Sequence, residues 1–215
     1  WMAYRSSAEE PWPEPVRVDE LSTVHDEGAP RVSADGLTIY FSSDRPGVGS
    51  VDIYRSVRAH RSLAWDAPEL VTTVNGERAE SLFAVDESGL NAVFTRLDPG
   101  LALNSLDIFV SHRHLPGERW SVPEPAVELN TDQFGEAPGS LSADGLTLYF
   151  YSNADGGPVN LYAARRPTAD DPFGEPWPLV EVSTDGRDED PFVTPDGRAL
   201  YFARDGDLYR AERDQ

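Results

Sequence analysis

Apolar and polar residues alternate along this chain in short runs, and the runs return at a regular spacing. The segments Ser33 to Phe41 and Ser142 to Phe150 are almost the same nine residues, and weaker copies begin near Glu87 and Pro195. The Asp-Gly pair in these segments supplies the positive φ that a tight hairpin needs, and alternating β-branched and aromatic residues follow it. No stretch shows convincing helical spacing at i, i+3 and i+4. The pattern predicts antiparallel strands from end to end.

Two further marks keep the same period and order. One is an acidic or amide residue followed by an aliphatic and an aromatic residue, beginning at Asp52, Asp107, Asn160 and Asp207. The other is a tryptophan before a proline-containing extended run, at Trp12, Trp65, Trp120 and Trp177, with spacings of 53, 55 and 57 residues. Tandem four-stranded units of this length are typical of β-propeller blades, which bury their faces against one another. We expect the tryptophans to lie on outer strands and to pack between blades.

The marks predict an all-β fold, a single β-propeller domain over residues 1–215 with four four-stranded antiparallel blades. The blades span about 27–76, 77–132, 133–186, and 187–215 together with 1–26. The last unit lacks its outer strand, while the N-terminus holds a spare one near Trp12. We therefore expect the N-terminal and C-terminal strands to pair and close the ring, which removes an open edge. Five blades, one of them partial, is the alternative, because Met2-Ala3-Tyr4 resembles a further copy of the Asp52 mark.

Composition narrows the classes of function. The net charge is -20, from 18 basic and 38 acidic residues, and such a surface repels phosphates rather than neutralising them, which argues against nucleic acid. The absence of cysteine excludes disulfides, zinc–thiolate sites and a cysteine nucleophile. No apolar run reaches the roughly 18 residues of a membrane span, and no signal peptide opens the sequence. We expect a monomer that does not insert into membranes.

One longer pattern resembles a known family. Glu-x-x-Pro-x-x-Ser-Ala-Asp-Gly-x-x-Ile-Tyr-Phe-Ser-Ser-Asp-Arg, followed by Asp-Ile-Tyr, resembles the propeller repeats of the TolB-like bacterial family. The match covers Glu27 to Tyr54 best and Glu136 to Tyr162 well, and it is weak around Asp86 to Gly89. The resemblance implies the propeller fold and a bacterial envelope location, periplasmic or extracellular. Relatives include binding scaffolds and domains attached to enzymes, so no activity follows from it.

Propellers usually act at the mouth of the central channel, where the loops that enter each innermost strand converge. One carboxylate per blade is expected there, namely Glu27, Glu80, Glu136 and Glu189. Candidate ligand-binding residues around them are Arg45, Arg78, Arg96, Arg187, Arg204 and Asp190. In one interpretation each acid only binds backbone N–H groups or an arginine of the next blade, and the ring staples the blades together. In the other, Glu27, Glu136 and Glu189 hold Ca²⁺ or Mg²⁺, because these ions prefer oxygen ligands.

The leading functional hypothesis is a non-enzymatic binding module of the bacterial envelope. Its ligand, a small molecule, a sugar or a protein, would sit at the acidic channel mouth. An enzyme is the alternative, a hydrolase, lyase or cyclase with His25 and the four mouth carboxylates as candidate acid and base and a divalent cation as possible cofactor. A third hypothesis is a multivalent lectin that stacks sugars on the repeated tryptophans.

Overall fold

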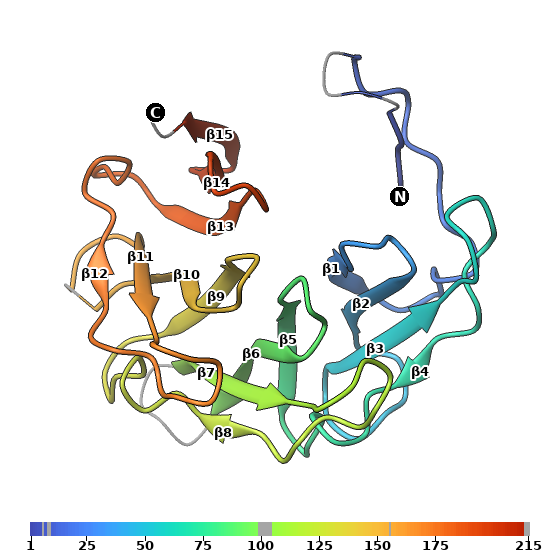
Figure 1. Ribbon diagram of the computed structural model, residues 1–215, viewed down its shortest axis with the longest axis horizontal. Coiled ribbons are helices and arrows are strands. Elements are labelled where there is room, and N and C mark those ends of the chain that lie inside the picture. The colour runs from blue at the N-terminus through green and yellow to red at the C-terminus, as the bar shows by residue number, and fades with distance from the viewer. Residues whose placement is uncertain (6, 8–9, 99–104, 155, 213–215) are drawn as a thin grey trace.

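Short antiparallel strands form the whole fold in this computed structural model, which describes residues 1–5, 7, 10–98, 105–154 and 156–212 (Figure 1). Three sheets have four strands and the last has three, and we number them as the first to fourth blades. The first blade contains β1 (Glu27–Val32), β2 (Thr38–Ser43), β3 (Asp52–Val57) and β4 (Glu69–Leu70). The second contains β5 (Ala79–Val85), β6 (Asn91–Asp98), β7 (Ser105–His112) and β8 (Glu124–Pro125). The third contains β9 (Glu136–Leu141), β10 (Thr147–Ser152), β11 (Asn160–Arg165) and β12 (Trp177–Pro178), and the fourth contains β13 (Asp188–Val193), β14 (Ala199–Arg204) and β15 (Asp207–Glu212). The predicted all-β, four-bladed propeller fold is confirmed.

The turn that joins the first two strands of a blade shows why these segments form hairpins. Gly36 has a φ of 70° and Gly145 a φ of 69°, a backbone region that favours glycine. Before the first of these glycines, Asp35 accepts a hydrogen bond from the Leu37 N–H at 2.9 Å and another from the Ser33 hydroxyl at 2.6 Å. These side-chain bonds fix the turn locally, so the sequence repeat becomes a structural repeat.

Hydrophobic cores lie between neighbouring blades. Trp120, which precedes β8 of the second blade, packs against Tyr40 of the first blade with ring centroids 6.5 Å apart, and against Phe83 of its own blade at 5.4 Å. Trp65 occupies the corresponding place beside the first blade, and both tryptophans are 5% exposed. The first and second blades thus each bury a tryptophan, as the period predicted.

The third blade departs from the predicted tryptophan pattern. Trp177 is a residue of β12, where it pairs with Ala163 and remains 43% exposed. The buried place belongs to Phe173, which is 3% exposed and belongs to the core between the second and third blades. The prediction that Trp177 is buried between blades like Trp65 and Trp120 was wrong. Phe173 takes that position, because it follows Arg166 by seven residues as Trp65 follows Arg58, and its ring also fills the space.

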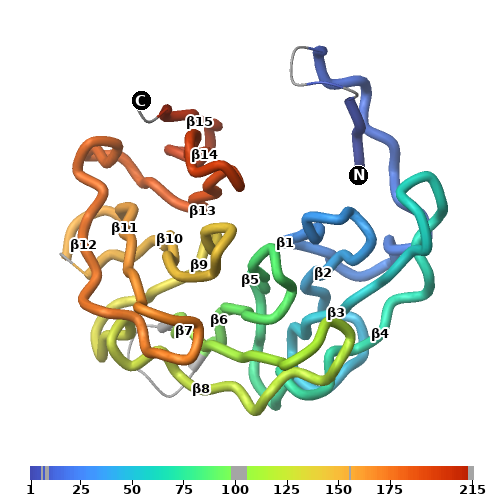
Figure 2. Tube along the Cα trace, in the orientation of Figure 1, coloured from blue at the N-terminus to red at the C-terminus, as the bar shows by residue number. Residues whose placement is uncertain are grey.

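The blades follow one another around an arc, with β1, β5, β9 and β13 nearest the middle and β4, β8 and β12 at the rim (Figure 1). Neighbouring blades contact each other through these inner strands, whereas the strands of the first and fourth blades do not touch each other in the described part of the chain. The chain ends lie at opposite ends of the arc (Figure 2).

The predicted pairing of the N-terminal and C-terminal strands is absent from the described residues. Met2 instead forms a bridge with Val16, in which each N–H donates to the other carbonyl at 2.8 Å. Met2 and Val18 pack on the core of the first blade, and the Arg58 guanidinium donates to the Tyr4 hydroxyl at 2.7 Å. These contacts hold the N-terminal segment at the first blade, so the expectation of a closed ring and of residues 1–26 completing the fourth blade is corrected. Among the described residues, no strand pairs with the outer edge of β15.

Candidate functional site

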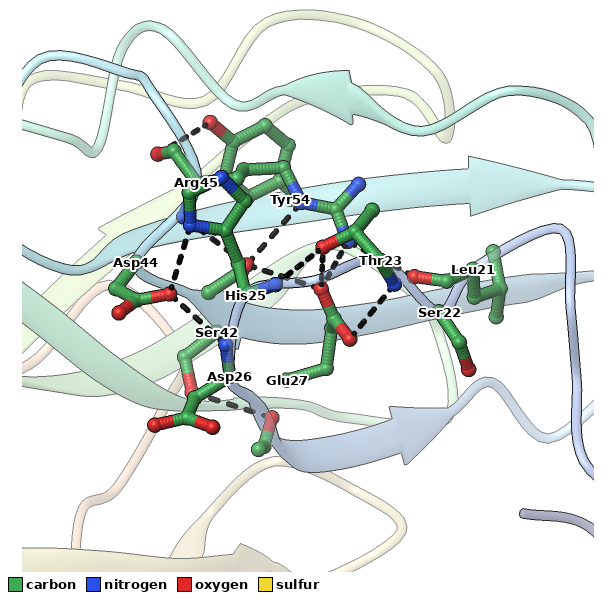
Figure 3. Close-up of polar contacts among 12 residues, drawn as sticks. Leu21, Ser22, Thr23, His25, Asp26, Glu27, Ser42, Asp44, Arg45 and Tyr54 are labelled. Atoms are coloured by element: carbon green, nitrogen blue, oxygen red, sulfur yellow. Dashed lines mark hydrogen bonds and ion pairs between the residues drawn. The ribbon is translucent and has the colours of Figure 1, made fainter.

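The first predicted mouth carboxylate, Glu27, lies in a network of internal hydrogen bonds (Figure 3). Its Oε1 accepts from Arg45 Nη2 at 2.9 Å and from the Thr23 hydroxyl at 2.6 Å, and its Oε2 accepts from the Thr23 N–H at 3.1 Å. Arg45 also donates to the Leu21 carbonyl at 2.8 Å. Burial opposes ionisation of Glu27, but the bonds from Thr23 and Arg45 outweigh it and hold the pKa of the carboxyl below its ordinary value.

The same arrangement returns in the second blade. Glu80 is fully buried and accepts from Arg96 Nε at 2.8 Å and from the Gly76 N–H at 3.0 Å. Arg96 in turn donates to the Val74 carbonyl at 3.0 Å and lies over the Phe109 ring, with its guanidinium carbon 4.5 Å from the ring centroid. The acid therefore ties the loop before β5 to β6, and the arginine adds a stacking contact.

In the fourth blade the equivalent acid is Asp188 rather than Glu189. Asp188 is fully buried, accepts from Arg204 Nε at 2.6 Å and accepts from the Thr184 N–H at 3.0 Å. Glu189, one residue later, points elsewhere and pairs with Arg187 at 2.8 Å. Asp188 stands three residues before Pro191, as Glu27 stands three residues before Pro30, and this shared spacing is the sequence signal that identifies the right residue.

The third blade has the acid without the arginine. Glu136 is 1% exposed, and its partners are the Thr131 N–H at 3.0 Å, the Thr131 hydroxyl at 2.9 Å and the Ser152 hydroxyl at 3.0 Å. Burial raises the pKa of the Glu136 carboxyl, and the nearby charge of Asp107 raises it further, against the effect of those hydrogen bonds. Among the described residues, Glu136 is therefore the one acid of the four that is held without an arginine.

These contacts favour the stapling interpretation of the acid ring over the cation interpretation. The arginines, however, belong to the acid's own blade and not to the next blade as expected. Glu27, Glu80, Glu136 and Asp188 each bind the loop and strands of their own blade. Among the residues that the structure describes, no three histidine or acidic side chains come together in a group that could hold a metal ion. The carboxylates expected to converge on a shared ion are instead engaged separately.

The remaining mouth candidates lie on exposed loops. His25 Nδ1 approaches Asp44 Oδ1 at 3.4 Å, and the His25 N–H donates to the Thr23 hydroxyl at 3.0 Å (Figure 3). Asp44 also accepts from the Asp26 N–H at 2.9 Å, so this pair orders the loop into β1. Arg78 is exposed on the loop into β5.

The buried tryptophans are covered by arginines that recur seven residues earlier in the sequence. Arg58 lies over Trp65 with its guanidinium carbon 4.1 Å from the ring centroid, and its Nε donates to the Gly36 carbonyl at 2.9 Å. Arg113 lies over Trp120 in the same way, at 4.2 Å. A sugar could not stack on rings buried in this manner, so Trp65 and Trp120 stabilise the blades instead.

A second polar cluster lies on the inner strands and joins three blades. Arg31 of β1 donates from Nη2 to the Gly139 carbonyl of β9 at 3.2 Å, a contact from the first blade to the third. The charge of Asp190 in β13 acts on Arg31 and on Tyr151 of β10. Arg31, Tyr151 and Asp190 form what we call the inner-channel cluster, and the Arg187–Glu189 pair flanks it.

The inner-channel cluster is partly shielded from water. Burial lowers the pKa of Arg31, while burial and then the charges of Asp190 and Glu189 raise the pKa of the Tyr151 hydroxyl. The pKa of Asp190 is raised by burial first and by Glu189 second. The Nε of Arg31 is buried and has no hydrogen-bond partner in the structure. Such a donor is costly to leave unsatisfied.

Sequence reasoning included Asp190 and Arg187 but missed Arg31 and Tyr151. Arg31 stands where the other blades have Ala84, Ser140 and Phe192, as the strand registers show. Arg31 could have been found from this difference, because it is the one charged residue at a repeat position that is small or apolar in the other three blades.

No protein-family model matches the chain, and no curated protein matches it. Solved structures match it in fold. A putative TolB from Agrobacterium tumefaciens aligns with a TM-score of 0.59 and 16% identity over 90% of this chain and 60% of that chain. TolB from Acinetobacter baumannii aligns with a TM-score of 0.60 and 15% identity over 90% of this chain and 42% of that one. The Hadza microbial sialidase Hz136 aligns with a TM-score of 0.54 and 12% identity over 86% of this chain and 44% of that one.

These similarities establish the fold alone, because identities of this size carry no function by themselves. The chain spans 60% and 42% of the lengths of the two TolB chains. The expected resemblance to TolB-like propellers is confirmed at the level of the fold. None of the described residues forms a helix long and apolar enough to cross a membrane.

Proposed function

We propose that this chain is a binding module of the bacterial envelope that holds a polypeptide segment against the inner-channel cluster. The fold shared with two TolB structures supports the envelope location and the binding role. The observation that carries the proposal is the buried, unpartnered Nε of Arg31, beside the Asp190 carboxyl and the Tyr151 hydroxyl.

The chemistry of this cluster matches a peptide main chain. Arg31 Nε–H needs an acceptor, and a backbone carbonyl provides one. The Asp190 carboxylate accepts hydrogen bonds, and a backbone N–H or a basic side chain provides the donor. The chain's net charge of -20 would also attract a basic partner over distance, which increases the rate of encounter. A partner with both donors and acceptors therefore fits the cluster better than a bare anion or cation.

The alternatives have less support in the geometry. The enzyme hypothesis relied on His25 acting with the mouth carboxylates, but His25 pairs with Asp44 and Glu27 is saturated by Thr23 and Arg45. The lectin hypothesis relied on accessible tryptophans, two of which are buried under arginines. The binding hypothesis is the one for which the structure offers unsatisfied polar atoms.

The proposal is tested with peptides selected from a random display library on the wild-type protein. Their affinities are then measured by fluorescence anisotropy for wild type, Arg31→Met, Asp190→Asn and the control Arg61→Met, which removes an arginine that binds the Ala34 carbonyl at a hairpin turn. Loss of a charged hydrogen bond should weaken binding by about tenfold or more for the first two variants and leave the control unchanged. Equal affinity for all four proteins, or a library with no enriched peptide, would overturn the proposal.

A further inference from the structure

An apolar groove of about 510 Å³ lies beside β15, between the third and fourth blades. Both blades contribute to its lining, whose large apolar side chains are Tyr149, Trp177, Leu179, Val182, Val193 and Leu200, and three charged residues also border it. β15 forms one wall through Ala211, and its outer edge has no strand paired to it in the described residues. We call this feature the edge groove.

The internal repeat identifies what the edge groove is shaped to hold. Trp120 of the second blade packs in a core whose members occupy the matching repeat positions, namely Tyr40, Val71, Val74, Val85 and Ala92. Tyr40 is the third residue of β2, as Tyr149 is of β10, and Val85 ends β5 as Val193 ends β13. The edge groove is therefore the place between blades that an aromatic residue of the next outer strand fills elsewhere. Trp177 of β12 lines it, but no aromatic residue of the described part of the fourth blade occupies it.

The other end of the arc carries an aromatic residue, Trp12, that is not buried between two blades. Trp12 follows Arg5 by seven residues, as Trp65 follows Arg58, and the Arg5 guanidinium carbon lies 4.3 Å from the Trp12 ring centroid. Trp12 is nevertheless 63% exposed, and Val16 is 71% exposed, whereas Trp65 is 5% exposed. Trp12 therefore has the same stacked arginine seven residues earlier as the buried tryptophans, but it is not itself buried.

The extended segment that carries Trp12 leads into contacts that resemble those of an outer strand. Val18 and Leu21 pack on the core of the first blade, as Val71 and Val74 pack on the core of the second. Residues 12–16 are thus placed as the outer strand of a blade that would precede the first one. Within one molecule this strand and β15 lie at opposite ends of the arc (Figure 2).

We propose that residues 12–16 of one copy of this chain complete the fourth blade of a second copy, with Trp12 inserted into the edge groove. Val16 stands four residues after Trp12, as Glu69 stands four residues after Trp65, and Glu69 pairs with Arg55. The residue of β15 that matches Arg55 is Arg210, opposite Tyr201. Val16 therefore exchanges its bridge to Met2 for the equivalent bridge to Arg210, and the N–H and carbonyl of Met2 pass to water.

Such a contact is head-to-tail, because the two surfaces are different parts of the chain. It gives dimers and longer assemblies whose average mass rises with concentration, in place of the monomer that composition suggested. The net charge of -20 opposes association, so moderate salt should strengthen it by screening.

Sedimentation equilibrium over a range of protein concentrations tests the proposal. Wild type should self-associate. Trp12→Ala should raise the dissociation constant of this self-association by about 30-fold or more, as expected for a buried anchor residue. Trp1→Ala is the matched control, since Trp1 is 80% exposed in the same segment but has no counterpart at the buried position. Ala211→Glu, with Leu179→Asp as a second choice, places a charge in the edge groove, and circular dichroism checks that each variant is folded.

Mixing two variants makes the test specific. Trp12→Ala retains the groove and Ala211→Glu retains Trp12, so each should be monomeric alone and the mixture should form a heterodimer and nothing larger. Three results would each overturn the proposal: a wild type that stays monomeric, a Trp12→Ala variant that associates like wild type, or a mixture that stays monomeric. A monomeric wild type whose melting temperature falls with Trp12→Ala would indicate closure within one chain, and this too contradicts the proposal.

Discussion

Two buried glutamates occupy the same repeat position, and we expect loss of the charge to lower the stability of the protein at one of them and not at the other. Glu80 binds Arg96 at 2.8 Å, whereas Glu136 has no arginine and is held by Thr131 and Ser152. The variants Glu80→Gln and Glu136→Gln remove one negative charge each and almost no volume. Because both side chains are at most 1% exposed, they form a matched pair in which the cation partner is the main difference.

The magnitudes follow from what each substitution leaves behind. Breaking a buried ion pair costs about 3–5 kcal/mol when the remaining charge is fully buried. The Arg96 side chain is 22% exposed and keeps its bond to the Val74 carbonyl, so we expect the lower figure of roughly 2–3 kcal/mol after allowing for this hydration. For a domain of this size each kcal/mol lowers the melting temperature by about 2–4 °C, which predicts a fall of about 4–12 °C. For Glu136→Gln we expect no loss, within about 1 kcal/mol, because the amide can bond the same N–H and hydroxyl groups.

Thermal unfolding followed by circular dichroism at neutral pH measures both variants against wild type. A clear fall for Glu80→Gln together with an unchanged or raised melting temperature for Glu136→Gln supports the assignment of the staples. Equal falls would refute the reasoning, because they would show that the arginine adds nothing to the acid's hydrogen bonds.

The difference in stability between wild type and Glu136→Gln should change with pH in a direction that can be checked. The raised pKa means that the folded protein holds the Glu136 proton more tightly than the unfolded chain does. The stabilisation from this effect is complete below the ordinary glutamate pKa and is lost as the pH rises through the folded value. Wild type and Glu136→Gln should therefore unfold at similar temperatures at low pH, and the variant should gain relative to wild type as the pH increases.

Three further outcomes are expected. Replacing Glu27 by Gln should lower the melting temperature near neutral pH, and the difference should shrink as the pH falls through the lowered Glu27 pKa, since that stabilisation exists only above the ordinary glutamate pKa. Arg113→Met should destabilise the second blade by about 1–2 kcal/mol in chemical denaturation, because it removes the contact with Trp120 and the bond to the Gly89 carbonyl, whereas the exposed control Arg119→Met should not. Calcium and chelator should each leave the melting temperature unchanged, and a rise with calcium would reinstate a cation site at the mouth.

Local patterns in the sequence were enough to predict the blades. The turn at Asp35 is fixed by bonds within five residues, and the aromatic before each outer strand is buried wherever its neighbours repeat. Features of this kind depend on residues close in sequence, so a repeat in sequence reproduces them. The stapling interpretation of the acids followed for the same reason, because each acid bonds within its own blade. The position of Asp188 was missed only because Glu189 lies next to it.

Features that depend on distant parts of the chain were not predictable in this way. Arg31 meets Gly139 across 108 residues, and no local pattern announces that contact. Ring closure also failed as a prediction, because a spare outer strand and a missing one indicate complementary ends but do not say that one molecule can bring them together. Met2 and Val18 hold the spare strand on the first blade instead.

The same logic links the two proposals while keeping them independent. Where all copies of a repeat position agree, as at the stapling acids, the residue is explained by folding. Where one copy departs from the others, folding leaves the departure unexplained and a function becomes the better explanation. Arg31 departs by carrying a buried donor without an acceptor, and Trp12 departs by carrying the buried motif on the surface. The first departure faces the channel and suits a peptide, whereas the second faces the end of the arc and suits another copy of the chain, so either proposal can fail without the other.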